Sequence, residues 1–154
     1  MRDNIESNHL IFISSDGKRE GYEIFKERIN NNSWPIYNKT PQSVNIQEGK
    51  KVLFYIAGTN SFSQNFIASA SISNIINQKS TTVDPNQEFK QVLFSVQFKD
   101  INYFERPINI KEHINNLSFI KTNKRKIYGL YFQGGICKIN KQSYDYIINN
   151  TSKN

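Results

Sequence analysis

Residues 50–73 read KKVLFYIAGTNSFSQNFIASASIS, two apolar runs joined by a polar connection. The runs at 50–58 and 65–73 are rich in β-branched and aromatic side chains, which favour strands. The Gly, Asn and Ser residues between them are typical of a turn. A third run of this kind, QVLFSVQFKDI, follows at residues 91–101. Together they predict neighbouring strands of a sheet that curls on itself.

One further strand and a helix are predicted before this central part. HLIFIS, at residues 9–14, is an apolar run of strand length. After it, apolar residues recur at the spacing of an amphipathic helix that starts at Ser15 or Asp16. The apolar positions of this helix are Tyr22, Phe25 and Ile29.

The C-terminal third mixes helical and extended patterns. Residues 109–120 indicate a helical turn or two, and residues 127–139 indicate an extended segment broken by Gly134 and Gly135. Asn140 is a suitable cap for a terminal helix, whose apolar face would carry Tyr144 and Ile147 or Ile148. The predicted fold class is therefore α+β, a small mixed β-barrel with a few helices at its margins.

Length and composition indicate one domain that folds without disulfide or metal cross-links. The 154 residues show no repeat and no interior linker, so we expect a single domain over residues 1–154, with a core at about 8–149 and frayed termini. One cysteine, Cys137, excludes a disulfide framework and favours a reducing compartment, and His9 and His113 share no metal-ligand spacing. No signal peptide and no apolar stretch of about 18 residues is evident, so we expect a soluble cytoplasmic protein that contacts no membrane.

Charge and motifs favour binding over catalysis. The formal net charge is +7, from 20 Lys and Arg against 13 Asp and Glu, which raises the chance of an anionic partner. Gly58, Gly134 and Gly135 fit neither a phosphate-binding loop nor a dinucleotide motif. The acidic residues are scattered and form no evident catalytic pair. We therefore expect no enzymatic activity, no cofactor and no metal.

The only tryptophan stands in a polar segment, NNNSWPIYN, at residues 30–38. Trp34, Tyr37, Phe62 and Phe66 fall in expected loops, interleaved with the amide and hydroxyl side chains of Asn32, Ser33, Asn38, Asn60, Ser61, Gln64 and Asn65. Aromatic faces beside amides suit a flipped or single-stranded base, which is held by stacking and by hydrogen bonds to its edge. In the alternative, Trp34 plugs the barrel core and the phenylalanines begin the next strand.

Two long segments resemble the EVE domain, a PUA-like family related in architecture to YTH and ASCH domains. The first, SWPIYNKTPQSVNIQEGKKVLFYIAGTNSFSQNFIASASIS (33–73), resembles the family's tryptophan loop followed by a Gly-Lys element and an apolar strand. The second, INYFERPINIKEHINNLSFIKTNKRKIYGLYFQGGICKINKQSYDYI (101–147), is similar to its proline-led stretch, LxFI motif, basic turn, glycine-containing aromatic segment and closing helix. The resemblance covers roughly residues 8–149 and implies a PUA-like barrel that binds modified bases.

The resemblance also implies where the base would bind. The pocket residues carried over are Ser33, Trp34, Pro35, Ile36, Tyr37, Asn38, Tyr55 and Ser61. Two further family tryptophans are replaced here, and Tyr128, Tyr131 or Phe132 are candidates for the second wall. Gln133 is a candidate to present its amide to the base edge, although the glycines after it could equally serve only to kink a strand.

The basic run KTNKRK, at residues 121–126, precedes the aromatic segment. Its charged residues are candidates for phosphate contacts, or alternatively form a solvated turn: Lys121, Lys124, Arg125 and Lys126.

The predicted function is a small module that recognises methylated or hydroxymethylated cytosine, or methylated adenine, in a nucleic acid. We expect a monomer, for which a separate nuclease or base-modifying enzyme is a candidate partner. Two alternatives stay open: an ASCH-like ribonuclease or nucleobase-acting enzyme, and a protein-protein adaptor whose aromatic residues form a hot spot.

Overall fold

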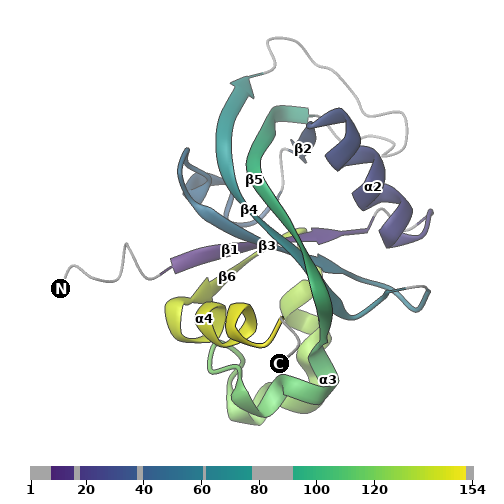
Figure 1. The fold of residues 1–154 in the computed structure, drawn as a ribbon, viewed down its shortest axis with the longest axis vertical. Coiled ribbons are helices and arrows are strands. Elements are labelled where there is room, and N and C mark those ends of the chain that lie inside the picture. Colours follow the sequence, from purple (N-terminus) through teal and green to yellow (C-terminus); the bar gives the residue numbers. More distant parts are fainter. Residues whose placement is uncertain (1–7, 16–17, 38–39, 61, 78–91, 152–154) are drawn as a thin grey trace, which may run out of the picture.

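The computed structural model describes residues 8–15, 18–37, 40–60, 62–77 and 92–151 (Figure 1). Its strands are β1 (Asn8–Ser14), β2 (Trp34–Tyr37), β3 (Lys51–Ile56), β4 (Asn65–Asn77), β5 (Val92–Asn109) and β6 (Ile136–Asn140). Its α-helices are α2 (Gly21–Asn31), α3 (Ile110–His113) and α4 (Lys141–Asn149). Three segments are 3₁₀-helical: Ser43–Asn45, Ile114–Asn116 and Thr122–Phe132.

All six strands belong to one mixed sheet with the order β2-β5-β4-β3-β1-β6. β1 and β3 pair in parallel, whereas the other neighbours are antiparallel. The pairing of β4 with β5 shifts register at several points, and such irregularities bend and twist long strands. The sheet curls as a half-barrel whose edges are β2 and β6 (Figure 1). This architecture confirms the predicted α+β class with a mixed, curled sheet.

The central strands β1 and β3 are covered on both faces. Residues 10–14 and 52–56 are all buried, and because side chains alternate along a strand, each strand contributes to two cores. Phe12 and Phe54 enter the first core, under α2, whereas Ile13 and Tyr55 enter the second. Their continuous apolar runs are thus explained by burial from two sides.

Helices close each core from outside the sheet. Phe25 and Ile29 of α2 complete the first core. The second core is completed by Ile110 of α3, Phe132 of the segment Thr122–Phe132 and Ile147 of α4. Figure 1 shows α2 on one side of the crossing central strands, with α3 and α4 on the other.

Several sequence predictions are confirmed. The apolar runs at 9–14, 50–58, 65–73 and 91–101 correspond to β1, β3, β4 and β5. The terminal helix follows Asn140 as expected, because the Asn140 side chain accepts a hydrogen bond from the Ser143 backbone N–H (2.9 Å). Phe66 lies one residue into β4 and is fully buried, as the strand alternative proposed.

Three local predictions are wrong. The first helix starts at Gly21 rather than at Ser15 or Asp16, because its first turn lies against the end of β1: Ser14 Oγ donates to the Gly21 carbonyl (2.5 Å). A Cβ on Gly21 would lie 2.6 Å from the Ser14 carbonyl oxygen, so only glycine allows this approach. Asp16 lies outside the described residues.

The other two corrections concern the aromatic segments. The SWPIY segment is not a loop, because Trp34–Tyr37 pairs with β5 as the edge strand β2. The extended pattern predicted for 127–139 holds only for β6. Before it, Thr122–Phe132 coils as a 3₁₀ segment, which brings Phe132 onto Tyr55 with ring centroids 4.1 Å apart.

Within the described ranges, no helix is long and apolar enough to cross a membrane. In the same residues, no group of three His, Cys, Asp or Glu side chains is placed to hold a metal ion.

Candidate functional site

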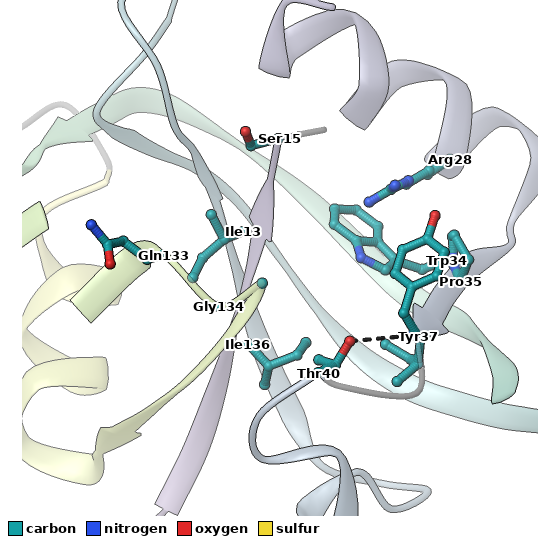
Figure 2. A pocket seen from close by; sticks show the side chains of 12 residues that line it. Ile13, Ser15, Arg28, Trp34, Pro35, Tyr37, Thr40, Gln133, Gly134 and Ile136 are labelled. Carbon is teal, nitrogen blue, oxygen red and sulfur yellow. Dashed lines mark hydrogen bonds between the residues drawn. The ribbon is translucent and has the colours of Figure 1, made fainter. Parts of the chain in front are cut away.

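A hollow lies at the gap between the two edge strands of the half-barrel. β2 borders it on one side and the start of β6 on the other, with the end of β1 between them. Its volume is about 110 Å³, and a closed apolar cavity of about 150 Å³ holds one benzene ring. We call it the edge hollow, and it is lined by Ile13, Ser15, Arg28, Trp34, Pro35, Ile36, Tyr37, Thr40, Gln133, Gly134, Gly135 and Ile136 (Figure 2).

Trp34 borders this hollow from within the first core. Its side chain is 2% exposed and contacts the aromatic rings of Phe12, Phe25, Phe54 and Phe98, at centroid distances of 5.5, 6.5, 5.3 and 6.0 Å. The core alternative for Trp34 is therefore correct. The indole shapes the floor of the hollow and leaves little of its face free for a ligand.

Tyr37 is the more accessible aromatic residue of β2. It is half-buried, and Figure 2 shows its ring beside Trp34 at the hollow. Its backbone is held by two hydrogen bonds: the Tyr37 N–H donates to Thr40 Oγ1 (3.1 Å), and the Thr40 N–H donates to the Tyr37 carbonyl (3.1 Å). The residue that can offer a flat face is thus positioned by its own turn.

Arg28 brings a positive charge to the hollow, and the sequence analysis missed it. It lies on the inner face of α2, 9% exposed, with its guanidinium carbon 5.0 Å from the centre of the Trp34 ring. This is the geometry of a cation-π contact. The spacing of Ile24, Phe25, Arg28 and Ile29 was the available signal, because it places the arginine on the apolar face of the helix.

The far wall is backbone from the turn before β6. The Gly135 carbonyl accepts a hydrogen bond from the Ile13 N–H (2.8 Å), which ties the turn to β1. A Cβ on Gly134 would lie 2.4 Å from Pro41 Cγ, and Gly135 has φ +91°. Close approach and a positive φ therefore explain the glycine pair.

A second hollow lies beside the first and has a volume of about 430 Å³. We call it the aromatic hollow, and it is lined by Tyr55, Ala57, Gly58, Gln64, Lys126, Tyr128, Gly129, Phe132 and Gln133. Tyr55 and Phe132 are buried and stacked, with 13° between the ring planes. The Tyr128 hydroxyl donates to Gln64 Oε1, and Gln133 lines both hollows.

Burial extends to higher pH the range in which the tyrosines of the aromatic hollow stay neutral. It raises the pKa of Tyr55 above its ordinary value, with a smaller contribution from neighbouring Tyr128, and it raises the pKa of Tyr128 as well. Both hydroxyls are therefore neutral near pH 7 and can donate hydrogen bonds.

The family model of the EVE domain matches residues 15–150. The chain belongs to the EVE-domain family. No curated protein matches it in sequence, but solved structures share the fold. Human THYN1, solved in complex with DNA containing 5-methylcytosine, is 14% identical with a TM-score of 0.59, covering 96% of this chain and 99% of that one.

Two bacterial proteins of known structure share this fold as well. Atu2648 from Agrobacterium tumefaciens is 11% identical with a TM-score of 0.58. Rpa0253 from Rhodopseudomonas palustris is 10% identical with a TM-score of 0.56. Each match covers 93% of this chain and 92% of the other. The predicted family and the PUA-like fold class are thereby confirmed.

The predicted base-binding residues of this EVE domain lie in two hollows, whereas one pocket was expected. Those of the edge hollow are Trp34, Pro35, Ile36, Tyr37 and Gln133, and those of the aromatic hollow are Tyr55, Tyr128 and Gln133. Ser33 and Tyr131 line neither; the Tyr131 hydroxyl accepts a hydrogen bond from the Lys121 N–H (3.0 Å). Asn38 and Ser61 lie outside the described residues. The split arises because the turn at 133–135 meets the end of β1.

The predicted phosphate-binding residues of the EVE domain lie on the segment Thr122–Phe132 and at its start. Lys121, Lys124 and Lys126 are exposed, and Lys126 lines the aromatic hollow. Arg125 is half-buried, and its guanidinium donates to the Asn115 carbonyl (3.4 Å). The three lysines are therefore the accessible charges of this segment.

Proposed function

We propose that this EVE domain binds a nucleic acid that carries a modified base, and that the edge hollow receives this base. The observation that carries the proposal is a hollow of about 110 Å³ that opens between the edges of β2 and β6, with a half-buried tyrosine at its side. The complex of human THYN1 with DNA containing 5-methylcytosine supports the same ligand class for a relative of this fold.

Each part of the edge hollow has a role in this proposal. Tyr37 offers a stacking face, since every base has a π-face and a base-aromatic stack contributes about 1 to 3 kcal/mol. The apolar side chains of Ile13 and Ile136 suit the methyl group of a methylated base. Thr40, Gln133 and the backbone at Gly135 are hydrogen-bonding groups for its edge.

We propose binding rather than turnover at this site. Among the described residues that line the edge hollow there is no Asp, Glu, His, Cys or Lys. The hydroxyls of Ser15, Tyr37 and Thr40 are present, but the described lining holds no histidine, carboxylate or lysine that could activate one of them as a general base. Recovery of an unaltered oligonucleotide after prolonged incubation would support binding, and a cleaved or altered base would overturn it in favour of the enzyme alternative.

The test is a titration with matched oligonucleotides that carry cytosine, 5-methylcytosine, 5-hydroxymethylcytosine or N6-methyladenine at one position, as DNA and as RNA. We expect one modified base to bind more tightly than its plain counterpart. Tyr37→Ala should weaken that binding by about 1 to 3 kcal/mol, whereas Tyr37→Phe retains the ring and most of the affinity.

The matched control is Tyr103→Ala. Tyr103 is 56% exposed and lines neither hollow, so this variant should bind like the wild type. Equal affinity for all bases, or equal losses in Tyr37→Ala and Tyr103→Ala, would contradict a base-binding edge hollow.

A further inference from the structure

We propose that the aromatic hollow is a second subsite, which holds the unmodified nucleotide next to the modified base. This inference rests on the proposed function of the edge hollow. The two hollows meet at Gln133, which lines both, and Figure 2 shows its side chain across β1 from Trp34 and Tyr37. A strand whose modified base enters the edge hollow therefore brings an adjacent nucleotide to the aromatic hollow.

Volume distinguishes the two subsites. The edge hollow has about 110 Å³, below the roughly 150 Å³ of a cavity that holds one benzene ring, whereas the aromatic hollow has about 430 Å³. The larger hollow has room for a base together with its sugar. The smaller one leaves no room for a sugar beside a base.

The aromatic hollow has a rigid aromatic lining. Tyr55 and Phe132 stack on each other with ring centroids 4.1 Å apart, and the hydroxyl of Tyr128 is held by Gln64. Gln64 is itself fixed, because its N–H donates to the Ile56 carbonyl (2.5 Å) and its carbonyl accepts from the Ile110 N–H (2.9 Å). A preorganised ring binds a base at a low entropic cost, and stacking tolerates any base identity.

The charge around the aromatic hollow suits a nucleotide. Lys126 is exposed at its rim, and Lys124 is exposed on the same 3₁₀ segment. The described lining holds no Asp or Glu. A phosphodiester can therefore approach Lys126 while its base lies against Tyr128, and the amides of Gln64 and Gln133 remain near the base edge.

The experiment uses the wild-type chain and an oligonucleotide with the preferred modified base, in which the preceding or the following nucleotide is replaced by an abasic residue. Loss of one neighbouring base should weaken binding about tenfold, and loss of the other should have little effect. Changes below twofold for both abasic positions would overturn the second subsite, and a retained preference for the modified base would show that the proposed function stands without it.

Variants locate the neighbouring base in the aromatic hollow. Tyr128→Ala should bind the intact oligonucleotide about tenfold more weakly and should be indifferent to the abasic replacement, because the stack is already absent in this variant. Tyr128→Phe keeps the ring and should remain sensitive to it. If Tyr128→Ala instead abolishes the preference for the modified base and leaves the abasic effect intact, the assignment of the hollow is wrong.

A second variant tests the subsite independently, in case Tyr128→Ala does not fold. Gly129 lines the hollow and a Cβ there would meet no atom within 4 Å, so Gly129→Leu is expected to fold and to add bulk at this lining. It should reproduce the tenfold loss and the indifference to the abasic replacement, with Gly129→Ala as its nearly neutral match. Wild-type binding by a folded Gly129→Leu would count against the subsite.

Discussion

At the scale of single residues, the two aromatic side chains of β2 differ in burial. Trp34 is enclosed by four phenylalanine rings, whereas Tyr37, three residues later, is half-buried at the edge hollow. Trp34, which has the largest apolar side chain, therefore contributes to the stability of the fold. The half-buried residue, Tyr37, is the one that we assign to the ligand.

Trp34→Ala should lower the free energy of unfolding by about 3 to 5 kcal/mol, because it removes a buried indole and leaves a cavity. Urea denaturation of the wild type and the variant measures this loss. Tyr103→Ala, which removes an exposed ring, serves as the control and should cost far less. A Trp34→Ala protein with wild-type stability would show that the indole is not a core residue.

The buried thiol of Cys137 predicts a pH dependence of the free energy of unfolding. Burial raises the pKa of its thiol from 9.0 to about 12, so the folded protein retains the proton that the unfolded chain releases. The corresponding stability is complete below pH 9.0 and is lost as the pH rises toward about 12. The free energy of unfolding should therefore fall less steeply over this interval in Cys137→Ala than in the wild type. Identical slopes, from urea titrations at each pH, would contradict the shift.

At the scale of elements, the segment Thr122–Phe132 connects the second core to the surface. Phe132, at its end, is buried against Tyr55, whereas the lysines at its start are exposed. A kink at Ile127 separates the two parts. The segment carries exposed lysines, of which Lys126 lines the aromatic hollow.

Neutralising the exposed lysines of this segment should weaken nucleic-acid binding without changing base preference. In the triple variant Lys121→Gln, Lys124→Gln and Lys126→Gln, the slope of log K against log salt should flatten by about one unit for each phosphate that the protein no longer neutralises. The affinities for modified and plain oligonucleotides should fall equally, because phosphate contacts carry no base information.

The control is a second triple variant of exposed lysines that line neither hollow: Lys99→Gln, Lys111→Gln and Lys138→Gln. It makes the same change in net charge. If both triple variants flatten the salt slope equally, the segment has no specific role in phosphate binding.

At the scale of the whole molecule, one sheet supports two cores. β1 and β3 contribute side chains to both, so neither core can lose its packing without exposing the other face of the same strands. The half-barrel leaves β2 and β6 unjoined, and the edge hollow opens where closure fails. The edge hollow therefore exists because the sheet does not close into a complete barrel.

The shared strands predict one cooperative unfolding transition. Fluorescence of the single tryptophan reports on the first core, and alkylation of Cys137 in urea reports on the second, against which this residue packs. The two probes should give the same midpoint and slope. Separate transitions would show that the cores fold as independent units.

Local patterns in the sequence were sufficient for the elements that depend on their own residues. The continuous apolar runs predicted β1 and β3, and Asn140 predicted the start of α4, because strand burial and helix capping act over a few neighbouring residues. The order of loose motifs also indicated the family. The predicted residues Trp34, Tyr37, Tyr55, Tyr128 and Gln133 do line the hollows.

The roles of these residues depend on contacts that form only in the folded chain. The polar neighbours of Trp34 indicated a loop, but pairing with β5 makes the segment an edge strand and turns the indole into the core. The segment 127–132 has a strand-like composition, yet packing of Phe132 on Tyr55 accompanies a 3₁₀ coil. Arg28, from α2, reaches Trp34 only in the folded chain. Such contacts join residues far apart in sequence, and they outweigh the weak conformational preferences of short segments.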